Sequence, residues 1–256
     1  MQTKNREAYE KKKVVNNYLS LSKIFPAEQK LLSILEKYNK RDSILDLGIG
    51  AGRTTVFLAP LFRTYIGIDY SEKMIEVCEN RFSKLENTKF IVADVMNLPQ
   101  LNLGKFDSII FSFNGISLLK TIEDRKLLLN YIFNSLNQEG IFAFSTHNVN
   151  VIKKHYSFQF PKRNPFKIIT EILRIKKLKK INGDVSNYEG KEYFQLYDGS
   201  EYFNALVTYT LPSFQVNLLK EAGFSRIDAY DMNGNLISEN HLKTVKDHWV
   251  HYLCYK

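Results

Sequence analysis

The chain has 256 residues, 44% of them hydrophobic and 25% charged, which excludes a disordered or low-complexity protein. This length predicts a single domain over 1–256, with a helical cap at 1–40 and an insertion at 150–210. The net charge of +9 resides in residues 151–183, which hold ten basic residues and one acid, so the neutral remainder argues against a general nucleic-acid-binding protein.

The first 40 residues predict two helices, over 4–18 and 26–38, with Pro26 near the first position of the second helix. The N-terminus is charged and lacks an apolar stretch, so no secretory signal is predicted. No apolar run approaches the length of about 18 residues that a membrane-spanning helix needs. The two cysteines, Cys78 and Cys254, predict neither a disulfide framework nor a metal site. We therefore expect a cytoplasmic protein.

Residues 43–146 predict repeated β–α units. Their apolar runs are rich in β-branched and aromatic residues and do not alternate with polar ones, which is typical of strands buried on both faces of a parallel sheet. These strands are expected at 43–47, 64–69, 89–93, 106–111 and 140–146, with helices at 71–85 and 127–136. Farther along we expect a hairpin-like pair at 193–196 and 202–209, a helix at 213–222, and strands at 225–230 and 249–255.

The first predicted strand runs into a glycine-rich turn. Asp46 is followed by glycines at 48, 50 and 52 and then by a helical pattern. Glycine lets the backbone turn tightly and approach a ligand, and the first crevice of a doubly wound sheet holds nucleotide-like ligands. A dinucleotide fingerprint would place its third glycine at position 53, where this chain has Arg53. Taken alone, the glycines also fit a tight turn without a ligand.

The next three predicted strands also end in polar residues or glycine. Asp69 ends the second strand, where a carboxylate can accept both hydroxyls of a ribose, although a turn or helix cap explains it equally well. Asp94 ends the third strand, and the fourth ends in Phe-Ser-Phe-Asn-Gly at 111–115. Because open α/β sheets bind ligands along this edge, the pattern predicts one ligand site across the four strand ends.

As a set, these motifs resemble the class I S-adenosylmethionine-dependent methyltransferases, over about 18–148 and again over 211–230. Residues 45–52 are similar to the family's first motif, whose backbone surrounds the methionine part of the cofactor; 66–71 and 93–99 resemble the second and third. The resemblance implies S-adenosyl-L-methionine as the cofactor and S-adenosyl-L-homocysteine as its product. It also implies an α/β, Rossmann-like, doubly wound sheet of seven mostly parallel strands, with the last strand antiparallel.

The resemblance also implies a role for individual residues. Asp69 would hold the ribose hydroxyls, while Tyr70 would lie along the adenine, which Met74 would flank. Asp94 would accept from the adenine amino group, and Val95 would donate a backbone N–H. The complete implied set for the cofactor is Tyr18, Asp46, Gly48, Gly50, Gly52, Asp69, Tyr70, Met74, Asp94, Val95 and Phe111. Tyr18 either belongs to a lid over the cofactor or packs among the N-terminal helices.

Two residues just beyond the fourth and fifth strands are candidates for catalysis. Asn114 can orient a nucleophile or the amino-acid end of the cofactor. His147 can act as a general base near neutral pH, but a strand-end histidine bonded to a carbonyl is an equal alternative. The turn at 112–115 lacks the proline-rich tetrapeptide of amino-methyltransferases of DNA and protein glutamine, and looks more like the small-molecule branch. The sequence has no acidic cluster of the kind that would hold a metal ion, so no metal site is predicted.

The basic segment has three interpretations. Residues 166–181 combine apolar residues at helical spacing with lysines and an arginine, which predicts an amphipathic helix with a cationic face. This helix can rest on the core as a solvated cap, line the acceptor site and hold a phosphate or other anion, or lie on an anionic membrane. Because this family often builds its acceptor lid after the fifth strand, the position favours a role in substrate choice.

The sequence therefore predicts methyl transfer to O or N of a small, anionic molecule, such as a phosphorylated or nucleotide-activated metabolite or a cell-surface carbohydrate precursor. Three alternatives stay open. They are an RNA methyltransferase that uses 151–183, a non-catalytic module that binds the cofactor, and an NAD-type oxidoreductase. The oligomeric state and the methylated atom are not predicted.

Overall fold

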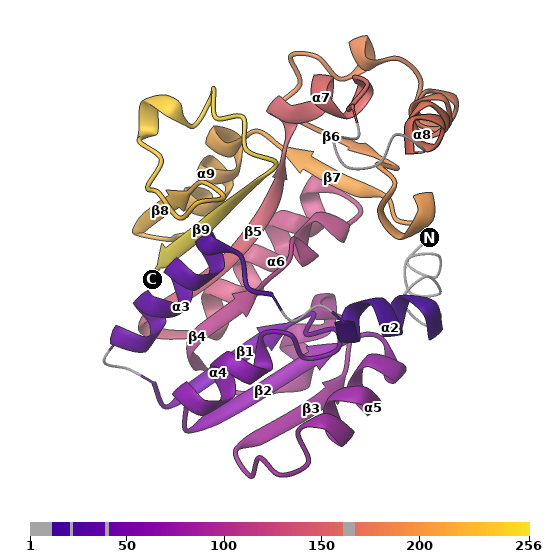
Figure 1. Cartoon of the computed structure of the whole chain (residues 1–256). Coiled ribbons are helices and arrows are strands. Elements are labelled where there is room, and N and C mark those ends of the chain that lie inside the picture. Colours follow the sequence, from indigo (N-terminus) through magenta and orange to yellow (C-terminus); the bar gives the residue numbers. More distant parts are fainter. Residues whose placement is uncertain (1–11, 21–22, 39–40, 161–166) are drawn as a thin grey trace.

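The computed structural model describes residues 12–20, 23–38, 41–160 and 167–256, and within them the strands form one nine-stranded sheet. Five parallel strands lie in the order β3-β2-β1-β4-β5 (Figure 1). Their bounds are β1 (Ser43–Leu47), β2 (Thr64–Asp69), β3 (Thr88–Val92), β4 (Phe106–Phe111) and β5 (Leu136–Asn148). β9 (Trp249–Tyr255) runs antiparallel to β5 and also pairs with β8 (Arg226–Tyr230), so the predicted α/β fold with an antiparallel last strand is confirmed.

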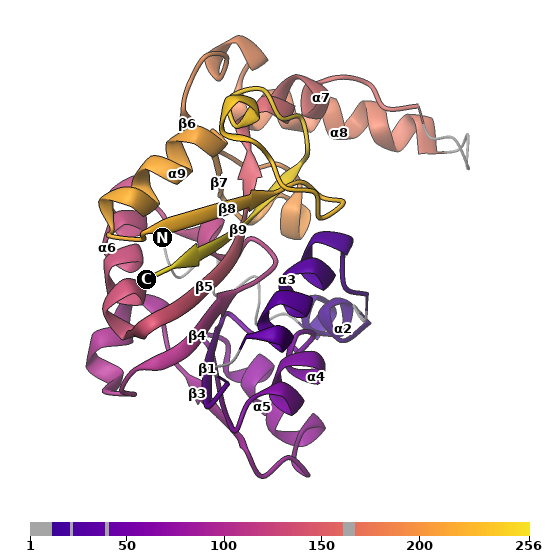
Figure 2. The same cartoon turned by 90° about the vertical axis from the view of Figure 1, so that its left-hand side faces the viewer.

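Helices cover both faces of this sheet (Figure 2). One face carries α6 (Ile122–Ser135) and α9 (Pro212–Glu221), and the other carries α3 (Pro26–Lys37), α4 (Thr55–Leu58) and α5 (Glu72–Arg81). Successive residues of a strand therefore enter different cores, which explains why the strands are apolar without alternation. In the described part of the chain, no helix combines the length and apolar content needed to cross a membrane.

Alternate burial is clearest in β5. Phe142 and Phe144 stack on each other in the core under α6 and α9, while Ile141 and Ala143 belong to the core under α3 and α4. β5 is longer than predicted because it pairs with β9 through His147. These pairings extend the strand towards the edge at which the glycine-rich turn lies.

Other elements also differ from their predicted bounds. α6 begins at Ile122 rather than near 127, because the Thr121 hydroxyl accepts the Asp124 N–H at 2.9 Å and caps the helix. At the N-terminus, α2 (Lys12–Ser20) covers the second half of the helix expected at 4–18, whose first residues lie outside the described part.

The insertion after β5 contains α7 (Ile152–Tyr156), α8 (Lys167–Asn182), β6 (Tyr193–Leu196) and β7 (Val207–Thr210). β6 and β7 form the expected antiparallel pair, although β7 begins later than predicted because a short 3-10 turn precedes it. β7 joins the end of β5 in parallel and so adds the pair to the seven expected strands. The insertion has its own apolar cluster, which includes Leu178, Phe194 and Tyr209.

The N-terminal helices are attached to the glycine-rich turn. In α2, Val14 and Val15 pack on Ala51 of that turn. In α3, the Glu28 carboxylate accepts two hydrogen bonds from the Arg53 guanidinium, at 2.6 and 2.8 Å, and both side chains are buried. Arg53, which stands where a dinucleotide fingerprint has glycine, therefore serves to hold α3 against the turn.

This buried pair predicts a large loss of stability when one partner is removed. In Glu28→Ala the Arg53 cation stays buried without its counter-charge, so the free energy of unfolding should fall by about 3–5 kcal/mol in urea titrations. The control is Glu221→Ala, which breaks the exposed 2.9 Å pair with Lys126 and should cost under about 1 kcal/mol. Equal losses in the two variants would contradict this account of the pair.

Candidate functional site

The turn after β1 is a cradle of three glycines with left-handed backbone, at φ 63° for Gly48, 52° for Gly50 and 76° for Gly52. A side chain at the first two would narrow the space above the turn. A Cβ on Gly48 would lie 2.8 Å from the ring of Phe111, and one on Gly50 would lie 3.2 Å from the ring of Tyr18. Glycine is therefore required here for close approach as well as for φ.

Asp69, at the end of β2, is joined to this cradle. One carboxylate oxygen accepts the Gly50 N–H and the other accepts the Ser71 N–H, each at 2.9 Å. The carboxylate is almost fully buried yet lines the cavity above the turn. The carboxylate thus combines two backbone hydrogen bonds with a position on the cavity wall, at the strand end where the resemblance places the ribose.

The end of β3 continues the same rim. Asp94 accepts the Met96 N–H at 3.0 Å and caps a short 3-10 helix that begins at Val95. Met74, on the first turn of α5, is buried and also contributes to the cavity wall. Asp94, Val95 and Met74, to which the resemblance gives contacts with the adenine, thus line the same cavity.

These strand ends enclose a cavity of about 470 Å³, in the range typical of small-ligand sites. Nine of the eleven residues expected at the cofactor line it: Tyr18, Gly48, Gly50, Asp69, Tyr70, Met74, Asp94, Val95 and Phe111. Sequence reasoning missed other members of the wall, chiefly Phe113, Met96, Leu118 and Lys120. Their positions in turns carry no periodic signal, so only the fold brings them to the cavity.

Asp46 and Gly52 lie behind the wall rather than in it. The carboxylate of Asp46 is fully buried and accepts hydrogen bonds from Thr54 Oγ1 at 2.7 Å and from the Tyr65 hydroxyl at 2.8 Å. Burial raises the pKa of Asp46 to about 6, despite those two bonds. Gly52 packs against α5, where an added Cβ would come within 2.4 Å of the Phe82 ring.

The turn after β4 is strained in a way that its sequence does not reveal. Phe113 and Asn114 both have left-handed backbone, at φ 53° and 61°, and the Asn114 N–H donates to Ser145 Oγ at 3.0 Å. This turn places the ring of Phe113 in the cavity wall, whereas the Asn114 side chain is only 3% exposed and is not part of the wall. In the described residues, the Asn114 amide oxygen has no hydrogen-bond partner.

His147 lies beyond the cavity wall, at the end of a row of aromatic rings. Phe113 contacts Trp249 at 5.2 Å between centroids, and Trp249 contacts His147 at 6.1 Å. The imidazole also packs on the Tyr209 ring at 5.0 Å, and its Nδ1 is buried. Burial lowers the pKa of His147 to about 4, so the ring is neutral at physiological pH.

Residues 38–195 match the methyltransferase domain family. The chain belongs to this family. Its relatives include the putative methyltransferase YqeM of Bacillus subtilis, 28% identical over 43% of this chain and 44% of the relative. The demethylmenaquinone methyltransferase of Clavibacter sepedonicus is 26% identical over 77% of this chain and 71% of the relative. The chain thus spans less than half the length of the first of these proteins.

The fold agrees with this assignment. A solved S-adenosylmethionine-dependent methyltransferase from Clostridium acetobutylicum superposes with a TM-score of 0.61 at 19% identity, over 90% of each chain. The resemblance to the class I methyltransferases is therefore confirmed, and S-adenosylmethionine is the cofactor. The glycine cradle, the Asp69 carboxylate joined to it and the acid at the end of β3 lie around one cavity and fit that molecule.

Asp69 provides the sharpest test of this cradle. Asp69→Ala should weaken binding of S-adenosylhomocysteine by roughly 1–3 kcal/mol in calorimetry, the usual cost of losing hydrogen bonds to a charged group. Asp42→Ala, which removes a carboxylate that is 78% exposed, is the matched control and should leave the affinity unchanged. Unaltered affinity in the Asp69 variant would remove the ribose role from this residue.

Proposed function

We propose that the protein transfers the methyl group of S-adenosylmethionine to an oxygen or nitrogen of a small, anionic molecule. The observation that carries this proposal is the row of rings that leads from the cofactor cavity through Phe113 and Trp249 to a neutral His147. The cofactor supplies an electrophilic methyl group, so the protein must hold the nucleophile in line with it and receive a proton.

His147 is the proposed proton acceptor. Its Nδ1 is buried although the residue is partly exposed, so Nε2 is the nitrogen left to meet an acceptor molecule. Tyr209 and Trp249 restrict the orientation of the ring from two sides. A neutral imidazole can take the proton of a hydroxyl or an amine as the new bond to carbon forms.

Asn114 has a different proposed role. Because its side chain is enclosed, we assign it to positioning: the left-handed turn that it shares with Phe113 holds the Phe113 ring between the cofactor cavity and Trp249. The hydrogen bond from its N–H to Ser145 fixes this turn on β5. Its contribution to catalysis is therefore made through Phe113.

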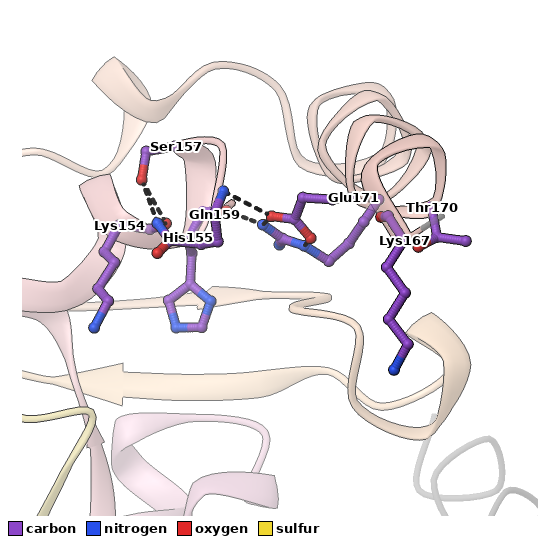
Figure 3. A network of polar contacts seen from close by, with 8 residues as sticks. Lys154, His155, Ser157, Gln159, Lys167, Thr170 and Glu171 are labelled. Carbon is purple, nitrogen blue, oxygen red and sulfur yellow. Dashed lines mark hydrogen bonds and ion pairs between the residues drawn. The ribbon is translucent and has the colours of Figure 1, made fainter. Parts of the chain in front are cut away.

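Lys154 supports an anionic acceptor. It lies on α7, directly after β5, and its charge lowers the pKa values of both His155 and His248, for each of which burial is the larger cause. In Figure 3 the side chains of Lys154 and His155 point the same way from α7, and His155 packs on Tyr209, which also contacts His147. Within the described residues Lys154 makes no ion pair, so its charge is available to an anionic group.

The first test is formation of S-adenosylhomocysteine from S-adenosylmethionine with a panel of small metabolites. We expect turnover with an acceptor that carries a phosphate or carboxylate. Cofactor binding without turnover on any acceptor would indicate a binding module, and turnover on RNA alone would indicate an RNA methyltransferase.

With a hydroxyl acceptor identified, His147→Ala should lower turnover by about 100-fold because the proton has no acceptor, while affinity for S-adenosylhomocysteine stays within about twofold. The control is His241→Ala, an exposed histidine whose ring bonds to Ser238 and makes none of the ring contacts of His147. A base acts only when deprotonated, so wild-type activity should fall as the pH drops through about 4, without a His147-dependent limb near 6.5. If the His147 variant turns over at the wild-type rate, His147 has a structural role and is not the proton acceptor.

Lys154→Ala should raise KM for the anionic acceptor by about tenfold, with little change for an uncharged analogue of it, because one charge-assisted contact is lost. Lys153→Ala is the matched control, since Lys153 is already paired with Glu189 at 3.3 Å. An equal rise in KM for the charged and uncharged acceptors would exclude recognition of the anionic group by Lys154.

A further inference from the structure

α8 is held to the rest of the protein along one side only. Its single buried residue is Leu178, which belongs to the apolar cluster of the insertion. On the same side, Arg174 pairs with Glu171 at 2.8 Å and donates to the His155 carbonyl at 3.0 Å, while Glu171 accepts the Gln159 N–H at 3.2 Å (Figure 3). The expected solvated cap helix, with its apolar stripe on the core, therefore accounts for only one side of α8.

The opposite side of α8 exposes apolar residues. Ile169 is 67% exposed, Ile172 41% and Leu173 57%. The spacing of these residues, i, i+3 and i+4, places them on one face, and Lys176 and Lys180 continue it at i+7 and i+11. The outward face of α8 thus has an apolar first half and a basic second half.

The segment before α8 adds two aromatic side chains. Phe158 is 45% exposed and Phe160 67%, and their rings contact each other at 6.4 Å. The Gln159 N–H bond to Glu171 places this segment beside the first half of α8. Five large apolar residues of the insertion therefore meet water, three of them on one face of α8.

The charge of α8 selects among partners. This helix contains six basic residues and one acidic residue, Glu171, which pairs with Arg174. The positive charges of the other five basic residues, all lysines, are therefore not balanced by an acid on the helix. Lysines beside an exposed apolar ridge match the two layers of an anionic bilayer surface, in which the ridge enters the acyl boundary and the lysines meet lipid phosphates. RNA offers no apolar layer for the three aliphatic residues in the first half of this face.

The position of α8 permits such contact. In Figure 2, α8 projects from the body of the molecule, with its N-terminal end farthest from the sheet. A flat surface can therefore reach the outward face of α8 without meeting the helices that cover the sheet. We propose that the outward face of α8 binds the surface of an anionic lipid bilayer. This proposal does not depend on methyl transfer.

The test is flotation of the full chain with vesicles of phosphatidylcholine alone or with phosphatidylglycerol added. Wild type should bind the anionic vesicles at least about tenfold more tightly than the neutral ones, and less tightly at high salt. The triple variant Ile169→Ser, Ile172→Ser, Leu173→Ser should lose at least about tenfold in affinity for anionic vesicles, because the inserted ridge is gone. The variant Lys176→Gln, Lys179→Gln, Lys180→Gln should lose the preference for anionic vesicles.

Matched controls change similar residues elsewhere. The apolar control is Val56→Ser, Phe57→Ser, Leu127→Ser, whose side chains are 40–43% exposed on other helices. The charge control is Lys37→Gln, Lys84→Gln, Lys89→Gln, at exposed positions. Both controls should bind as wild type does. The shift in melting temperature with S-adenosylhomocysteine, retained in all variants, shows that each is folded and separates this test from that of the methyltransferase site.

Three results would overturn the proposal. The first is that wild type does not bind anionic vesicles. The second is that the variant Ile169→Ser, Ile172→Ser, Leu173→Ser binds them as tightly as wild type does. The third is a concentration-dependent dimer of wild type that this same variant abolishes. The last result would assign the face to a second copy of the chain. Salt-dependent binding to polyuridine that is lost in the lysine variant, with vesicle binding absent, would likewise assign the lysines to RNA.

Discussion

The two oxygens of the Asp69 carboxylate accept one N–H from the turn after β1 and one from the turn after β2. Two loops from different strands are thereby held at a set distance before any ligand arrives. Hydrogen bonds from backbone N–H groups to a buried carboxylate are strong, so the cradle is preorganised. Ligand binding therefore costs little conformational entropy in these loops. The position of Gly50 in the cradle is thereby fixed by this one side chain.

A second constraint connects this cradle with the acceptor side. Arg53 is paired with Glu28 on α3, and its guanidinium lies 4.8 Å from the centroid of the Phe113 ring. Phe25, at the start of α3, packs on both Phe113 and Trp249. The N-terminal helices therefore do more than cover the core: they also hold the Phe113 and Trp249 rings that connect the cofactor cavity with His147.

The insertion packs around an apolar cluster of its own. Its apolar cluster is separate from the two cores of the sheet, and its attachment is the pairing of β7 with the last residues of β5. The insertion also contacts the cofactor cavity, because Gln195 on β6 donates hydrogen bonds to the carbonyls of Leu119 and Lys120 in the cavity wall. Its basic residues have two proposed roles. Lys154, on the short helix that follows β5, binds the anionic group of the acceptor, while the lysines of α8 bind the bilayer surface.

The sequence by itself determined the order of the strands and helices, the glycine turn and the acids at the strand ends, because each of these signals is local to a strand and the turn that follows it. Together with the family resemblance that these motifs carry, it predicted nine residues of the cavity wall. It did not reveal that Asp46 and Gly52 lie behind that wall, that the Asn114 side chain is buried, or that the backbone of Phe113 is in the left-handed conformation. The surroundings of His147 and the exposure of α8 were decided only by the tertiary structure. Burial and pKa depend on neighbours such as Tyr209 and Trp249, which are far away in the chain and become neighbours only when the sheet has formed.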